Sequence, residues 1–214
     1  MVALTAGPAI DAIRPLLSWL DMGGVAVFAI SGALAAARVK STIVTFAFFA
    51  AVTGIGGGTL RDLLIGAPVF WVGRSDYLGV CLAAAGAVWL VRADRWPLPA
   101  LLWFDAIGMA AYAVIGAAKA DSLGVPPLPS IVMGVLTASF GGIIRDVLAG
   151  QPSILMRREI YVSAAALGAA TYVTLVVLGV DRIVAGAMGM VAAFSLRALA
   201  IGKGLALPAY GDDR

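Results

Sequence analysis

Long apolar runs, separated by short clusters of charged residues, proline and glycine, follow one another along the whole chain. Each is close to the roughly 20 residues that a helix needs to cross the hydrocarbon core of a membrane. They lack the short alternating segments of a membrane β-strand. We therefore predict an all-α polytopic membrane protein with seven spanning helices, at residues 20–37, 43–66, 75–92, 100–118, 129–150, 159–179 and 182–200.

Composition strengthens this prediction and excludes several other classes. Of the 214 residues, 62% are hydrophobic and 13% are charged, whereas soluble domains carry about 25% charged residues. The chain has no histidine and one cysteine, Cys81, inside an apolar run, which rules out disulfides, Cys/His metal sites and Ser/His/Asp triads. Its basic residues form no stripe of the kind that binds nucleic acid. We expect a single membrane domain over residues 1–214, with no enzymatic activity, cofactor, metal site or nucleic-acid partner.

An internal repeat organises the helices. Shifting the chain by 84 residues brings unusual residues into register, which shared composition alone does not explain. Each copy holds three helices, an odd number, so the second must enter the membrane from the opposite side. We predict an inverted repeat of residues 20–92 and 100–179, followed by a seventh helix at 182–200. The paired residues include Asp21 with Asp105, Thr53 with Thr137, Arg61 with Arg145, Asp62 with Asp146, and Tyr77 with Tyr161.

The basic residues between the helices predict the orientation, because cytoplasmic loops carry an excess of lysine and arginine. One side has four: Arg14, Arg74, Lys119 and Arg182. The other side has nine: Arg38, Lys40, Arg92, Arg95, Arg157, Arg158, Arg197, Lys203 and Arg214. We expect the N-terminus outside and the C-terminus in the cytoplasm.

Two glycine-rich segments occupy equivalent places in the second and fifth predicted helices, TGIGGGTLRDLLIGAP at 53–68 and TASFGGIIRDVLAGQP at 137–152. Glycine inside a helix is about 1 kcal/mol less favourable than alanine. We therefore expect Gly56, Gly57 and Gly58 to bend or unwind the second helix. In the second copy, Phe140 precedes Gly141 and Gly142, so the fifth helix should bend less freely.

An Arg-Asp pair follows each glycine segment, at Arg61–Asp62 and Arg145–Asp146, well inside the predicted membrane depth. Adjacent helix residues point about 100° apart, so each arginine is expected to seek a partner on another helix, with Asp21 assigned to Arg61 and Asp105 to Arg145. The charges then either brace the bundle or line a polar path. For the path, glycine carbonyls would supply oxygens together with the hydroxyls of Thr53, Thr59, Thr137 and Ser139.

The sequence resembles the trimeric intracellular cation (TRIC) channels of bacteria and archaea. The resemblance lies in the two glycine–Arg-Asp segments, the internal repeat and the number of helices. The resemblance implies a homotrimer in a prokaryotic inner membrane, surrounded by lipid, with a path for potassium or sodium in each protomer. It assigns that path to the second and fifth helices. The residues carried over are Gly56, Gly57, Gly58, Arg61, Asp62, Gly141, Gly142, Arg145 and Asp146.

A second function stays open at this point. The start of a helix after a break, together with an arginine, also suits a carboxylate group. The same helices could therefore carry a small amino acid of the glycine type.

Overall fold

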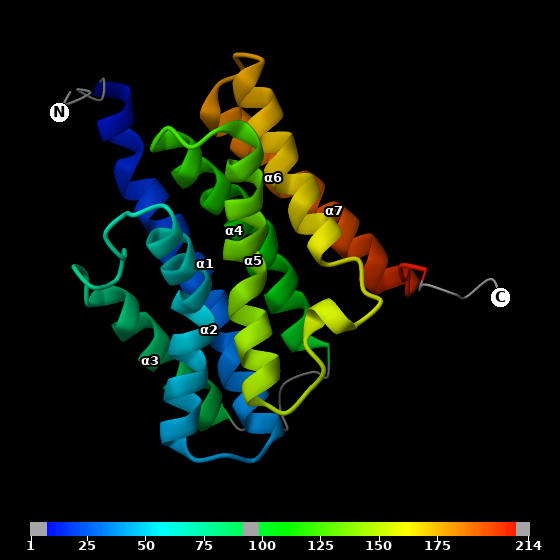
Figure 1. Cartoon of the computed structure of the whole chain (residues 1–214). Helices are drawn as coiled ribbons and strands as arrows, with labels where there is room; N and C mark the ends of the chain where they lie inside the picture. Colours follow the sequence, from blue (N-terminus) through cyan, green and yellow to red (C-terminus); the bar gives the residue numbers. More distant parts are fainter. Residues whose placement is uncertain (1–7, 92–98, 209–214) are drawn as a thin grey trace.

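The computed structural model describes residues 8–91 and 99–208. Within them the chain forms seven α-helices that run alternately in opposite directions (Figure 1), which confirms the predicted fold class. The helices are α1 (Pro8–Arg38), α2 (Ile43–Leu64), α3 (Asp76–Val91), α4 (Ala100–Ser122), α5 (Pro127–Leu148), α6 (Val162–Val177) and α7 (Arg182–Lys203), and a short 3-10 helix, η2 (Ile154–Met156), lies between α5 and α6.

Three helix boundaries differ from the sequence prediction for identifiable reasons. The first helix begins at Pro8 and not near residue 20, and proline suits a first helical position because it lacks the amide hydrogen that such a position does not need. Asp21 therefore lies well inside α1 and not at its start. Helices α2 and α5 end two residues early. Gly66 and Gly150, which follow them, have φ angles of 66° and 64°, a left-handed conformation that ends a helix.

The two three-helix units enter the bundle from opposite ends. Helix α1 starts at the end of the molecule that holds the α2–α3 and α4–α5 loops, whereas α4 starts at the other end (Figure 1). Helix α1 packs against α4, and α2 packs against α5, so equivalent helices of the two units meet. Helix α7 lies outside the repeat and packs against α4 and α6.

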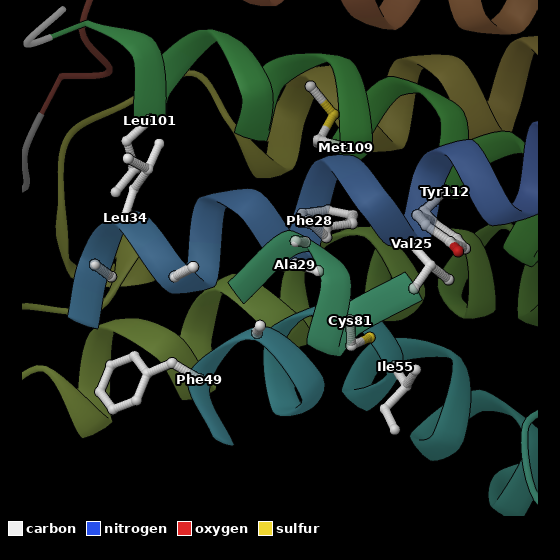
Figure 2. Close-up of a cluster of buried hydrophobic side chains, with 14 of the residues drawn as sticks. Val25, Phe28, Ala29, Leu34, Phe49, Ile55, Cys81, Leu101, Met109 and Tyr112 are labelled. Carbon is white, nitrogen blue, oxygen red and sulfur yellow. The ribbon is translucent and has the colours of Figure 1, made fainter. Parts of the chain in front are cut away.

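The core lies between α1 and its neighbours (Figure 2). Phe28 of α1 and Tyr112 of α4, which are equivalent in the two units, stack with their ring centroids 5.5 Å apart. A side chain at Gly24 or Gly108 would run into Tyr112 or Phe28, respectively. The ring of each unit thus fills the space that the glycine of the other unit leaves.

The outer surface of the bundle is apolar. Large apolar residues such as Val44, Leu90 and Leu178 are 72–80% exposed. Five helices are long and apolar enough to span a membrane, namely α1 over Asp21–Arg38, α2, α4, α5 and α7; α3 and α6 are apolar but shorter. This surface suits lipid, and the chain is a multi-pass membrane protein.

The glycine segments do not unwind their helices. Helix α2 continues through Gly56–Gly58, and α5 continues through Gly141 and Gly142, so the expected unwound backbone is absent there. The glycines instead allow close approach. A Cβ atom at Gly57 would lie within 3.0 Å of the Thr137 carbonyl oxygen, and one at Gly141 equally close to that of Thr53. Because lipid does not drive helices together, small residues at such crossings determine how closely they pack.

Replacing Gly57 by alanine tests this packing role. The added methyl group meets the α5 backbone, and overpacking of this kind costs about 1–3 kcal/mol, so Gly57→Ala should lower the melting temperature of the detergent-solubilised protein. Gly56→Ala is the matched control, because its Cβ would lie 3.4 Å from Ile144 and alanine favours the helix. Equal melting temperatures for the two variants would contradict the close crossing.

Candidate functional site

Two clusters of charged side chains are buried at opposite ends of the α2–α5 pair. Arg61, Asp62, Arg145 and Asp146 are each at most 5% exposed. Each arginine contacts the aspartate next to it, with Nε–Oδ1 distances of 2.8 Å for Arg61–Asp62 and 2.9 Å for Arg145–Asp146. The expectation that adjacent side chains would not pair was therefore wrong. The long arginine stem folds back along the helix and overcomes the angular separation of the two positions.

Arg145 lies at the centre of the second-unit cluster. Its Nη1 atom donates to Oδ1 of Asp105 at 2.5 Å and to Oγ of Ser31 at 2.5 Å, which confirms the predicted Asp105–Arg145 pair. Nη2 lies 2.8 Å from Oδ1 of Asp146. Arg157, from the α5–α6 loop, lies 3.8 Å from the other oxygen of Asp146. Side chains of α1, α4 and α5 thus surround one buried guanidinium group.

The first-unit cluster is built differently. Asp62 accepts from Nζ of Lys119 at 2.7 Å and from the backbone N–H of Phe70 at 3.0 Å, in addition to Arg61. Asp21 accepts from the hydroxyl of Tyr77 at 2.5 Å. The structure does not form the predicted Asp21–Arg61 pair. The hydroxyl of Tyr77 bonds to the carboxylate of Asp21, whereas the equivalent Tyr161 donates to a backbone carbonyl and leaves Asp105 to Arg145.

Sequence reasoning missed Lys119 and Tyr77 as members of this cluster. The coincidence of Tyr77 with Tyr161 was visible in the repeat, although it carried no partner assignment. Lys119 had no such signal, because its equivalent in the first unit is Ala35. Its role becomes visible only once the end of α4 is placed beside the end of α2.

Aromatic residues of the α2–α3 loop cover the first-unit cluster. The Phe70 ring packs so closely on Gly58 that a Cβ atom there would lie 2.7 Å from the ring. Arg61 stacks on the same ring, with its Cζ atom 5.9 Å from the centroid. The indole N–H of Trp71 donates to the hydroxyl of Thr59 at 2.9 Å. Aromatic side chains therefore cover this end of the α2–α5 pair.

The second-unit cluster instead borders a cavity of about 240 Å³. The equivalents of Phe70 and Trp71 are the aliphatic residues Ile154 and Leu155, which supply no aromatic cover. Oδ2 of Asp105 and Oδ2 of Asp146 are buried without a hydrogen-bond partner among the described residues. The cavity is lined by Ala35, Arg38, Val39, Leu101, Leu102, Asp105, Arg145, Asp146, Ala149, Gln151, Ile154 and Arg157.

Most of the hydroxyl groups predicted to line a path bond to their own helix. Thr59 donates to the carbonyl of Ile55 at 2.7 Å, Thr137 donates to Met133 at 2.6 Å, and Ser139 donates to Val135. Thr53 is buried at the α2–α5 crossing, and its Oγ1 atom has no hydrogen-bond partner among the described residues. Phe140, which follows Ser139 on α5, is half-buried. Among the residues that the structure describes, no group of histidine, cysteine, aspartate and glutamate side chains could bind a metal ion.

Comparison with known proteins finds membrane-protein relatives that match most of the chain. A family model described as "Glycine transporter" matches twice, over residues 18–93 and 102–177. The chain is 40% identical to the UPF0126 membrane protein of Vibrio cholerae, covering 91% of this chain and 83% of that one. It is 38% identical to the UPF0126 inner membrane protein YadS of Escherichia coli K12, covering 92% and 98%.

Solved structures show the same fold. The orthologue of the TRIC trimeric intracellular cation channel from Rhodobacter sphaeroides matches with a TM-score of 0.86 at 43% identity, over 90% of this chain and 100% of that chain. A structure described as the basis for conductance through TRIC cation channels matches with a TM-score of 0.83 at 29% identity, over 93% and 99%.

Fold, repeat and buried charges define a class of polytopic membrane proteins with two inverted three-helix units and one additional helix. The matched sequences and structures cover nearly the whole chain. The chain belongs to the TRIC channel family. Its structural neighbours are described as channels and not as enzymes, in agreement with the prediction from composition.

Replacing Arg145 tests the electrostatic account of the second-unit cluster. Arg145→Met leaves the carboxylates of Asp105 and Asp146 buried without their shared cation, and breaking a buried pair in this way costs about 3–5 kcal/mol. We expect a large fall in melting temperature, partly restored in the double variant Arg145→Met/Asp105→Asn. A double variant no more stable than Arg145→Met would show that the Asp105 charge does not depend on Arg145.

Proposed function

We propose that the protein is a channel for monovalent cations, with one permeation path in each protomer along α2 and α5. The observation that carries this proposal is that one carboxylate oxygen each of Asp105 and Asp146 is buried beside the cavity without a hydrogen-bond partner among the described residues, with only the Arg157 guanidinium 3.8 Å from that of Asp146. Oxygens in this state attract cations and hydrogen-bond donors, because burial without a partner is costly. The structural neighbours described as cation channels support the same function.

The pairing of the arginines removes an obstacle to this function. An unpaired positive charge beside the path would repel cations, but Arg145 contacts two carboxylates and Arg61 contacts one. The path that we propose runs from the cavity past the α2–α5 crossing towards the first-unit cluster. Its narrowest part is the crossing at Gly57 and Gly141, where Thr53 offers the unpartnered hydroxyl.

The residues proposed to border this path are those that the sequence singled out. They comprise the crossing and the two charged clusters. They are Thr53, Gly56, Gly57, Gly58, Thr59, Arg61, Asp62, Thr137, Ser139, Phe140, Gly141, Gly142, Arg145 and Asp146.

The setting of the channel is part of the proposal. We infer a homotrimer, as in the trimeric neighbours, in the inner membrane, as in the YadS relative. The excess of basic residues at the cavity end, including Arg38 and Arg157, favours placing that end in the cytoplasm and the N-terminus outside. Potassium and sodium are the proposed permeant ions, and lipid surrounds the exposed apolar faces.

A transporter for a small amino acid is the alternative. The cavity favours it in one respect, because it is lined by Arg38, Arg145 and Arg157 as well as by Asp105 and Asp146. Both charges of a zwitterion would find opposite charges there. The family description "Glycine transporter" agrees with such a cargo. Saturable uptake and counterflow of labelled glycine in proteoliposomes, without ion current, would favour the transporter.

A reversal potential separates the possibilities. In planar bilayers with asymmetric KCl, the purified protein should reverse close to the potassium equilibrium potential. Reversal near the chloride potential would show anion conduction. A complete lack of current over a wide voltage range would contradict the channel proposal.

Changing the charge at Gln151 tests whether the cavity is the mouth of the path. Gln151 is exposed and lines the cavity, so Gln151→Glu should raise the local cation concentration and the conductance at low salt, whereas Gln151→Lys should lower both. The same two changes at Ala67, the equivalent residue at the covered end, should have a smaller effect. Equal effects at both positions would contradict an asymmetric entrance.

A further inference from the structure

Equivalent tyrosines at the starts of α3 and α6 are each covered by an arginine, but the two arginines come from different places. Arg74 covers Tyr77, with its Cζ atom 5.0 Å from the ring centroid, and both belong to the first unit. Tyr161 is covered by Arg197 of α7 at 5.2 Å. The residue that the repeat would place over Tyr161 is Arg158, whose side chain is exposed. The helix outside the repeat has taken over this contact.

Arg197 also contacts the two residues that precede Tyr161. It is only 2% exposed, although it lies on a helix with an apolar surface. Nη2 of Arg197 lies 2.5 Å from Oε2 of Glu159, and Nη1 donates to the carbonyl of Ile160 at 3.5 Å. A buried arginine in a membrane helix is expensive and is usually kept for a specific contact. Here all these contacts go to residues 159–161.

The segment after α7 also contacts the α5–α6 loop, through backbone hydrogen bonds. Gly204, with a φ angle of 63°, turns the chain at the end of the helix. The backbone N–H of Leu207 then donates to the carbonyl of Arg158 at 2.8 Å. Ala206 forms an antiparallel β-bridge with Glu159. Residues 205–207 therefore lie across the α5–α6 loop as a strap.

This loop leads directly to the second-unit cluster. The hydroxyl of Tyr161 donates to the carbonyl of Ala138 in α5 at 3.1 Å. A Cβ atom at Gly142 would lie 3.5–3.8 Å from Arg145, Asp105 and the Tyr161 hydroxyl, so these groups surround one point of α5. Arg157, at the other end of the loop segment, lies beside Asp146 and lines the cavity.

We propose that Arg197 is a positioning residue for the cavity end of the path, and that α7 and the strap fix residues 157–161 against the Asp105–Arg145–Asp146 cluster. In the first unit, the tyrosine is covered by an arginine of the same unit, and no additional helix takes part. The positioning by α7 therefore acts only at the cavity end. The proposal goes beyond the proposed function because it assigns a role to α7. Only its effect on ion flux rests on that function.

Thiol accessibility tests the proposal without requiring conduction. A cysteine at Gln151 reports on the cavity, and a cysteine at Ala67 reports on the equivalent place at the covered end. The native Cys81 is buried, and the parent protein measures its background. A membrane-impermeant thiol reagent labels both reporters. Arg197→Met should release the loop and so change the labelling rate of the Gln151→Cys reporter severalfold. The labelling rate of the Ala67→Cys reporter should stay the same. Arg197→Lys should restore part of the difference by keeping the charge beside Glu159.

A second pair of variants keeps the test decisive if Arg197→Met does not fold. Leu207→Pro removes the N–H that bonds to Arg158, whereas Leu207→Ala keeps it; only the proline variant should alter labelling at position 151. Unchanged labelling in folded Arg197→Met and Leu207→Pro proteins would overturn the proposal. Equal changes at positions 67 and 151 would also overturn it and indicate a general brace.

Potassium flux through the same variants gives a separate readout. If the wild-type protein conducts, Arg197→Met should alter the flux in parallel with the labelling at position 151. A wild-type protein that does not conduct would defeat the proposed function and leave the labelling contrast to decide the role of Arg197.

Discussion

The close approach of α2 and α5 is the constraint on which the rest of the bundle depends. Gly57 faces the Thr137 carbonyl and Gly141 faces the Thr53 carbonyl, so each helix presents its backbone to the other at two equivalent places. In a membrane this contact gains little from the hydrophobic effect and depends on packing between surfaces without side chains. Once the crossing is fixed, the Arg-Asp pairs that follow the glycines lie at opposite ends of it.

Burial of those charges then determines which other elements must be present. A charged side chain at this depth needs partners from several helices, and the two ends obtain them from different sources. Arg145 is surrounded by Asp105 and Ser31 from α4 and α1. Asp62 pairs with Arg61 and with Lys119, from the end of α4, and accepts a hydrogen bond from the backbone N–H of Phe70. The fold is therefore symmetric in its backbone while its electrostatic contacts differ between the two ends.

The sequence predicted the backbone better than the contacts. Hydrophobic runs and the offset of 84 residues indicated seven helices and the inverted repeat, because both depend on length, composition and helix count. The Asp105–Arg145 pair followed from the same symmetry and is present. The Asp21–Arg61 pair, predicted by identical reasoning, is absent. Tyr77 donates to Asp21, whereas the equivalent Tyr161 donates to the Ala138 carbonyl. The repeat therefore predicts where each side chain is attached to the backbone, but not which of its neighbours it contacts.

The glycine run shows the same limit at the level of local structure. Helix propensity alone disfavours three consecutive glycines, which led to the expectation of a bent or unwound helix. Propensity contributes only about 1 kcal/mol per residue, and a helix held between packed neighbours can bear that cost when the glycines allow backbone contact. The three positions are also not equivalent: a Cβ atom would meet the α5 backbone at Gly57 and the Phe70 ring at Gly58, but would be accommodated at Gly56. The presence of Phe140 at the equivalent of Gly56 is consistent with this difference, because a Cβ atom at position 56 would come no closer than 3.4 Å to its nearest neighbour, Ile144.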